Sequence, residues 1–107
     1  MEALKKLYQT IFERKDSGDQ SSYTRYLFEK GLDKILKKCG EECAEMIIAA
    51  KNGDEGELVF ESCDLIYHML VLLCHQGIDV SRIEEELERR SLKKGNLKQP
   101  KSVDKDS

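Results

Sequence analysis

The chain is poor in the residues that make the frequent turns of β-rich domains. Its 107 residues include one proline, seven glycines and no tryptophan. All-β domains place proline and glycine between many short strands, so this scarcity argues against them. Hydrophobic residues make up 39% and charged residues 36% of the chain. This is the composition of one small folded domain with amphipathic helices.

Three further absences limit the partners and the location that we expect. The net charge of -3 provides no basic excess for a nucleic-acid backbone. The longest strongly apolar run, "MLVLLC" at 69–74, is far shorter than the ~20 residues that span a bilayer. The start, "MEALKKLYQT", lacks the apolar segment of a signal peptide. We therefore expect a cytoplasmic protein that binds neither nucleic acid nor a membrane.

The cysteines lack the spacing of a metal or redox motif. The chain has four, Cys39, Cys43, Cys63 and Cys74, and no Cys-x-x-Cys pair. Disulfides or a zinc site remain the alternative, but nothing points to a secreted protein. Free cysteine packs as a small hydrophobic residue, so we expect reduced cysteines in the core.

Apolar residues recur at helical spacing in five segments. The predicted helices cover 2–15, "YTRYLFEK" at 23–30, 32–51, 55–76, and 81 to about 90, the last starting at the capping box "SRIE". Ser22 is the expected N-cap of the second helix, and Gly31 and Gly77 follow the ends of the second and fourth. We expect an all-α bundle of about five helices over 1–92 and a solvated, mobile tail over 93–107.

Acidic residues interrupt the apolar faces of the two long helices. At 100° per residue, Glu42 falls at the edge of the apolar stripe of the third helix, and Glu45 lies one turn further along the same flank. Glu41 points more towards solvent, where an ordinary surface glutamate is as good an interpretation as a functional one. The fourth helix is apolar almost all round, which is typical of a buried helix. Its one polar stripe holds Glu57, Glu61, Asp64 and His68.

Carboxylates on buried helices must be protonated, paired with bases or bound to a cation. Salt bridges to lysines of the third helix are one possibility. However, Glu42-x-x-Glu45 and Glu61-x-x-Asp64 would face each other across an antiparallel pair, and their repulsion favours a divalent metal. Oxygen ligands select hard ions, so Mg²⁺ is the first expectation and Mn²⁺ the second.

Iron fits the pattern poorly. Di-iron bundle proteins use Glu-x-x-His pairs, and neither His68 nor His75 has a glutamate three residues before it. Two interpretations of His68 stay open, a hydrogen-bonded core histidine and a direct role in the site.

The spacing of the acids resembles the all-α nucleoside triphosphate pyrophosphohydrolase superfamily. Over residues 4 to 90 the flanking segments "SYT", "KKCGEECAE", "AAK" and "DLIYH" resemble more narrowly the phosphoribosyl-ATP pyrophosphatases of histidine biosynthesis. The resemblance implies Mg²⁺-dependent hydrolysis of phosphoribosyl-ATP to phosphoribosyl-AMP and pyrophosphate by a helical homodimer. Some relatives carry a fused cyclohydrolase domain, whereas this chain resembles the stand-alone enzyme.

Under this resemblance the acids have two roles. The four expected metal ligands are Glu42, Glu45, Glu61 and Asp64. One of these carboxylates, or Glu41, orients or deprotonates the attacking water, and we take Glu41 and Glu42 as the catalytic pair.

Cationic and hydroxyl side chains near the acids are candidates for substrate binding. Lys38 shares the flank of Glu42, and Lys51 ends the same helix; solvated surface lysines are an equal alternative. Tyr23, Thr24 and Arg25 begin the second helix, where hydroxyls and free amides suit an anion. A simple helix cap is the alternative there, and only the resemblance favours binding.

The fourth helix carries apolar side chains on more sides than one neighbouring helix can cover, so we expect a homodimer. Two other functions remain open. One is a house-cleaning enzyme of the same superfamily that hydrolyses a nucleotide such as dCTP or dUTP. The other is a non-catalytic helical adaptor whose acids pair with lysines.

Overall fold

The computed structural model describes residues 1–19 and 21–92, and these residues form helices and connections without any strand. The helices are α1 (Glu2–Arg14), α2 (Tyr23–Lys30), α3 (Leu32–Lys51), α4 (Glu55–His75) and α5 (Val80–Ser91). The all-α prediction is therefore confirmed, and each predicted helix end either coincides with the observed one or differs from it by one residue. The predicted tail, 93–107, lies outside the described residues.

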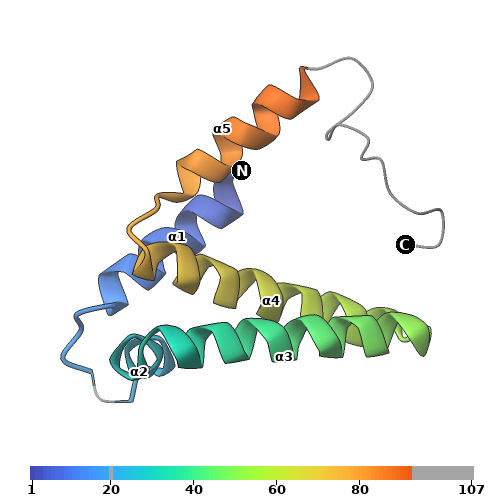
Figure 1. Cartoon of the computed structure of the whole chain (residues 1–107), viewed down its shortest axis with the longest axis horizontal. Coiled ribbons are helices and arrows are strands. Elements are labelled where there is room, and N and C mark those ends of the chain that lie inside the picture. The colour runs from blue at the N-terminus through green and yellow to red at the C-terminus, as the bar shows by residue number, and fades with distance from the viewer. Residues whose placement is uncertain (20, 93–107) are drawn as a thin grey trace.

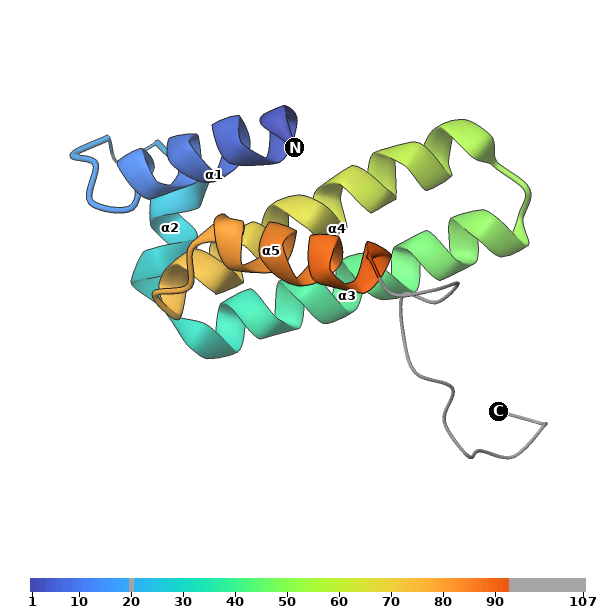
Figure 2. The ribbon, with the colours of Figure 1, turned by 90° about the horizontal axis from the view of Figure 1, so that it is seen from above.

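The two long helices form an antiparallel hairpin that carries the rest of the fold. The most extensive contact between helices is that of α3 with α4. The short α2 crosses one end of this hairpin, and α1 packs on α4 and contacts α5. Figures 1 and 2 show α1 and α5 leaving the hairpin at the end where α2 lies. The other end, formed by the second half of α3 and the first half of α4, is covered on fewer sides.

Local sequence explains where the helices begin and end. The Ser22 side chain accepts a hydrogen bond from the Arg25 amide and caps α2, as predicted. After α4, Gly77 has φ of +73°, which favours glycine. The Gly77 amide donates to Cys74 O over 3.1 Å, and the Ile78 amide donates to Leu73 O over 2.9 Å. This paired pattern closes the carbonyl end of α4.

The predicted capping box at Ser81 is wrong. Helix α5 begins at Val80, and its N-cap is Asp79, whose carboxylate accepts a hydrogen bond from the Ser81 amide over 3.0 Å. That hydrogen bond holds the pKa of Asp79 below its usual range. An ionised carboxylate is a stronger acceptor for the first-turn amides than a serine hydroxyl, and it also faces the positive end of the helix dipole.

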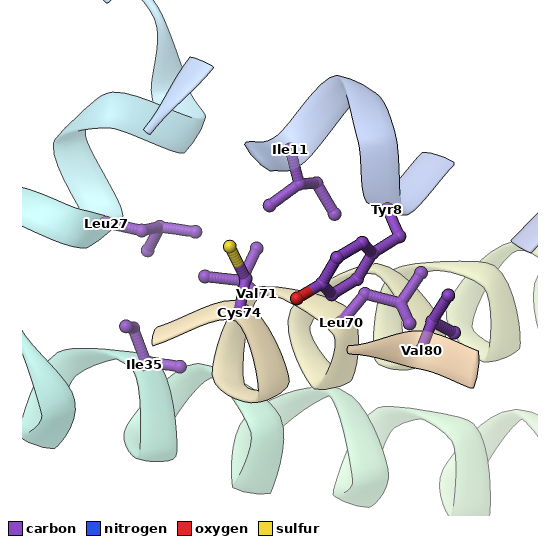
Figure 3. Packing of buried hydrophobic residues seen from close by; sticks show 8 residues of the cluster. All are labelled: Tyr8, Ile11, Leu27, Ile35, Leu70, Val71, Cys74 and Val80. Atoms are coloured by element: carbon purple, nitrogen blue, oxygen red, sulfur yellow. The ribbon is translucent and has the colours of Figure 1, made fainter. Parts of the chain in front are cut away.

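The hydrophobic core lies where α1, α2, the start of α3, the second half of α4 and the start of α5 meet (Figure 3). It comprises Tyr8, Ile11, Leu27, Ile35, Leu70, Val71, Cys74 and Val80. The Tyr8 hydroxyl donates to Ile78 O over 2.9 Å and ties α1 to the α4–α5 connection. Burial, the largest cause, raises the pKa of Tyr8 to about 12.

All four cysteines are free thiols, as expected. Cys74 lies in the core and Cys39 and Cys43 are half-buried, but Cys63 is exposed. The expectation of a core position is therefore wrong for Cys63, because the apolar circumference of α4 is wider than α3 and α1 can cover.

In the single chain, α4 is buried only in part. Val59 is 63% and Phe60 is 61% exposed, and on the facing part of α3 Ile47 and Ile48 are exposed as well. By length and composition α4 could cross a membrane, because an 18-residue window within it has a mean hydropathy of 1.4. That is weak evidence, since the core helix of a folded domain has the same length and composition.

Candidate active site

Three carboxylates meet between the two long helices. Glu42 and Glu45 lie one turn apart on α3, and Glu61 faces them from α4. One oxygen from each lies within 4.8 Å of the other two. Glu42 is 5% and Glu61 6% exposed, whereas Glu45 is open to solvent. We call Glu42, Glu45 and Glu61 the acid cluster.

Glu45 and Glu61 behave as a pair that shares a proton. The hydrogen bond with Glu45, followed by burial, raises the pKa of Glu61 to about 8. The same hydrogen bond lowers the pKa of Glu45. Two carboxylates this close cannot both be ionised cheaply, so the protein without a bound cation holds one proton between them at neutral pH.

Lys38 is the basic group beside the acid cluster. Its Nζ lies 3.6 Å from Glu42 Oε1 and 3.4 Å from Glu41 Oε1. Lys38 therefore balances part of the negative charge, as the salt-bridge alternative expects. It approaches Oε1 of Glu42 and leaves the second oxygen of that carboxylate to other partners.

The acid cluster has the donor chemistry of a site for a hard cation. Among the described residues, the buried side-chain oxygens without a hydrogen-bond partner are Glu42 Oε2 and Glu61 Oε2. Burying a carboxylate oxygen without a partner costs about 1–3 kcal/mol or more. A divalent cation that prefers oxygen ligands would satisfy both atoms at once. The residues present therefore fit such an ion.

A cavity opens beside the acid cluster. Its volume is about 380 Å³, and its lining residues are Glu45, Ile48, Ala49, Asn52, Asp54, Glu57 and Glu61. Glu57 lies on the polar stripe of α4, where no role was expected for it, and Asn52 was not expected at the site. Asn52 directly follows α3, and in the sequence "KNGD" it is indistinguishable from an ordinary residue at a helix end.

Two of the predicted acids lie apart from this group. Asp64 is half-buried one turn further along α4, and its carboxylate is not among the three that converge. Its backbone oxygen lies 2.8 Å from His68 Nδ1. Glu41 is exposed and contacts Lys38. Three of the four predicted ligands therefore come together as expected.

The predicted substrate-binding residues separate into two groups. Lys38 lies beside Glu42. Burial raises the pKa of Tyr23, and the charges of Lys38 and Glu42 nearby also influence it, so Tyr23 borders the same region. Thr24 is buried and shares a hydrogen bond with the Tyr67 hydroxyl.

The other two predicted binding residues lie at helix ends. The Arg25 guanidinium is 3.0 Å from Glu29, and Lys51 is exposed at the end of α3. Sequence reasoning did not anticipate the bond between the Tyr23 hydroxyl and His68 Nε2, 3.0 Å long.

The fold and the site together define a class, a small all-α protein whose paired helices carry carboxylates suited to a divalent cation. The profile of the phosphoribosyl-ATP pyrophosphohydrolase family matches residues 4–91. The chain belongs to this family.

Curated relatives agree with the family assignment. A phosphoribosyl-ATP pyrophosphatase of Clostridium botulinum is 55% identical over 100 residues, covering 92% of this chain and 91% of its own. One from Clostridium novyi is 49% identical over 98 residues, covering 92% and 89%. A histidine biosynthesis bifunctional protein of Caldanaerobacter subterraneus is 54% identical over 90 residues, which are 84% of this chain but 44% of that protein.

Proposed function

We propose that the protein hydrolyses phosphoribosyl-ATP to phosphoribosyl-AMP and pyrophosphate in the cytoplasm, as a step of histidine biosynthesis. The acid cluster carries this proposal, since two of its buried oxygens have no partner within the described residues. Cleaving a phosphoanhydride requires charge neutralisation and an aligned water more than covalent chemistry. A carboxylate site for a hard cation meets that requirement in a chain of this family.

The cation we propose is Mg²⁺, with Mn²⁺ as a substitute. When bound, such an ion neutralises phosphate charge and makes water a better nucleophile. Glu42, Glu45 and Glu61 would hold it, and Asp64 would supply a further oxygen from the next turn of α4. The proton that Glu45 and Glu61 share must leave when both carboxylates become ligands.

Glu41 and Glu42 are the catalytic residues in this proposal. Glu42 is buried within the acid cluster, so its role is to fix the position of the site. Glu41 lies outside the cluster, exposed and paired with Lys38, and it is the carboxylate that we assign to accept a proton from the attacking water. Glu41→Gln should then lower kcat about 10²- to 10⁴-fold while leaving the affinity for Mg²⁺ intact. Glu42→Gln should abolish turnover and also lower the affinity for Mg²⁺.

Lys38 is the strongest candidate for phosphate binding, because its ammonium group stands directly beside Glu42. Tyr23 borders the same region, and Arg25 and Lys51 would reach the more distant parts of the substrate from their helix ends. Thr24 would not contact the substrate. It would help to position α2 through the hydrogen bond that it shares with the Tyr67 hydroxyl of α4.

A homodimer would cover the exposed apolar surface of α3 and α4. Ile47, Ile48, Val59 and Phe60 are each more than half exposed in the single chain. Exposed apolar surface of this kind usually marks an interface. Light scattering coupled to size-exclusion chromatography tests the dimer, and Phe60→Asp should shift the mass towards the monomer if a second copy packs there.

The deciding experiment measures Mg²⁺-dependent pyrophosphate release from phosphoribosyl-ATP, ATP, dCTP and dUTP under identical conditions. Glu42→Gln should abolish turnover, and the exposed-site variant Glu13→Gln should retain it. Preference for dCTP or dUTP would indicate a house-cleaning enzyme with the same site. No release from any substrate would favour the helical adaptor.

A further inference from the structure

His68 is a buried histidine with a partner for each ring nitrogen. It lies on α4 and is 4% exposed. Its Nδ1 is 2.8 Å from the backbone oxygen of Asp64, and its Nε2 is 3.0 Å from the Tyr23 hydroxyl. The ring also meets those of Tyr23 and Tyr67 edge-on, with centroids 5.9 and 4.9 Å away. His68 therefore joins α4 to the first residue of α2.

The chemistry of these partners determines which nitrogen carries the proton. A backbone carbonyl can only accept, so Nδ1 must donate to Asp64 O. In a neutral imidazole the other nitrogen then accepts, so the Tyr23 hydroxyl must donate to Nε2. With a neutral His68 ring, the hydroxyl proton of Tyr23 is therefore directed into the protein and is not offered to a ligand.

Tyr23 has little else to fix its orientation. It begins a helix of eight residues and is 45% exposed. Its ring stacks loosely on Tyr67 and Tyr26, with centroids 6.2 and 6.1 Å apart. Without the bond to His68, the hydroxyl could rotate towards solvent and the ring could leave its place near Lys38.

We propose that His68 is a positioning residue for substrate binding. It holds Tyr23 with the hydroxyl turned inward, so that Tyr23 presents its ring, not its hydroxyl, to the nucleotide beside Lys38. This inference rests on the proposed hydrolysis of phosphoribosyl-ATP and deepens it. It also changes the role expected for Tyr23 from hydrogen bonding with phosphate to aromatic contact with the base or ribose.

Two matched variants of His68 separate its two hydrogen bonds. The amide of His68→Asn overlaps the Nδ1 position and retains the bond to Asp64 O, but it does not reach Tyr23. The amide of His68→Gln reaches the Nε2 position and can accept from Tyr23. His68→Asn should raise KM about 3- to 10-fold with kcat nearly unchanged, as expected for one neutral hydrogen bond, and His68→Gln should restore KM.

Variants of Tyr23 test which part of the side chain meets the substrate. Tyr23→Phe should raise KM only as much as His68→Asn, and combining the two should add nothing further, because both remove the same bond. Tyr23→Ala should raise KM at least several-fold more, because it removes the ring. Equal losses in Tyr23→Phe and Tyr23→Ala would overturn the proposal, since the hydroxyl would then be the contacting group.

A spectroscopic measurement tests the hydrogen bond without substrate. In ¹⁵N–¹H correlation spectra of the free protein, the His68 ring should carry its proton on Nδ1, and Tyr23→Phe should shift the Nε2 resonance. A proton on Nε2 in the neutral ring would overturn the proposed orientation. If the wild type fails to hydrolyse phosphoribosyl-ATP, the proposed function and the KM argument fall together, while the His68 spectrum still decides the hydrogen-bond argument. A His68→Gln variant with KM as high as His68→Asn would indicate a merely structural histidine.

Discussion

Glu42 on α3 and Glu61 on α4 face each other with one carboxylate oxygen each buried and without a hydrogen-bond partner in the described part of the chain. In an aqueous protein such a pair is unfavourable unless something positive lies between the two groups. Lys38 reaches the outer oxygen of Glu42, and the proton shared with Glu45 relieves Glu61. Without a cation, the buried carboxylates therefore lower the stability of the fold, and a bound cation would remove this penalty. Several consequences can be tested.

Mg²⁺ should stabilise the fold. At a concentration tenfold above its Kd, the ion adds about 1.4 kcal/mol to the free energy of unfolding, which corresponds to a rise in Tm of roughly 5–10 °C for a domain of this size. Thermal melts by circular dichroism in EDTA and in Mg²⁺, at matched ionic strength, measure the shift. Glu61→Gln should abolish it, and Glu13→Gln should preserve it. An equal shift in all three proteins would mean that the ion binds elsewhere.

Without a divalent cation, stability should fall as pH rises from about 5 to about 8. Folding raises the pKa of Glu61 from 4.5 to about 8, chiefly through the hydrogen bond with Glu45. In this window the folded protein holds a proton that the unfolded chain has released, so raising the pH favours unfolding. The lowered pKa of Glu45 has the opposite effect. It contributes stability at pH values above the ordinary pKa of a glutamate, and this contribution is lost only when the pH falls below that range.

Urea midpoints in EDTA from pH 5 to 8.5 measure this slope. Glu61→Gln should flatten it, because a neutral amide replaces the carboxylic acid and does not titrate. Glu13→Gln is the control and should follow the wild type. A slope that persists unchanged in Glu61→Gln would contradict the assignment of the shared proton.

Lys38→Gln should move two affinities in opposite directions. The Lys38 ammonium group lies 3.6 Å from Glu42 Oε1 and would repel a divalent cation held by that carboxylate, so its removal should tighten Mg²⁺ binding several-fold. The same change removes a phosphate contact and should raise the KM for phosphoribosyl-ATP. Isothermal titration with Mg²⁺ and steady-state kinetics measure the two effects. Weaker binding of both would point to a loss of local structure instead.

Tyr8→Phe should lower the free energy of unfolding by about 1 kcal/mol. The change deletes only the hydroxyl that donates to Ile78 O and joins α1 to the α4–α5 connection. Tyr26→Phe, at a position 37% exposed, should change stability by less than about 0.5 kcal/mol. Urea unfolding of the two variants at pH 7 gives the comparison, and equal losses would argue against a special role for the Tyr8 bond.

Leu27→Ala should destabilise the protein by about 2–5 kcal/mol. The Leu27 side chain is fully buried, at 0% exposed, and anchors α2 in the core. Leu92→Ala makes the same chemical change at a position 83% exposed and should have an effect within about 0.5 kcal/mol. Guanidinium unfolding measures both, and a small loss for Leu27→Ala would show that α2 can repack around the cavity.

Local sequence was enough to predict the helices. The apolar spacing, the Ser22 cap and the glycine after α4 are interactions within a few residues, and the structure repeats them. The same local geometry placed Glu42 and Glu45 on one flank of α3, because positions three residues apart share a helix face. The start of α5 could not be predicted from local sequence alone. Asp79 and Ser81 both carry side-chain oxygens that can cap a helix, and in the structure Asp79 is the N-cap.

Distances between helices required the tertiary structure. The sequence aligned Glu61 and Asp64 on α4 equally, but only Glu61 meets the acids of α3. Likewise, Thr24 and Tyr23 are neighbours in sequence, yet packing buried Thr24 against Tyr67 and directed the Tyr23 hydroxyl to His68. Helical periodicity places a side chain on a face, because it depends only on backbone geometry. Which partner that face meets depends on how α2, α3 and α4 cross, and packing of the whole core sets those crossings.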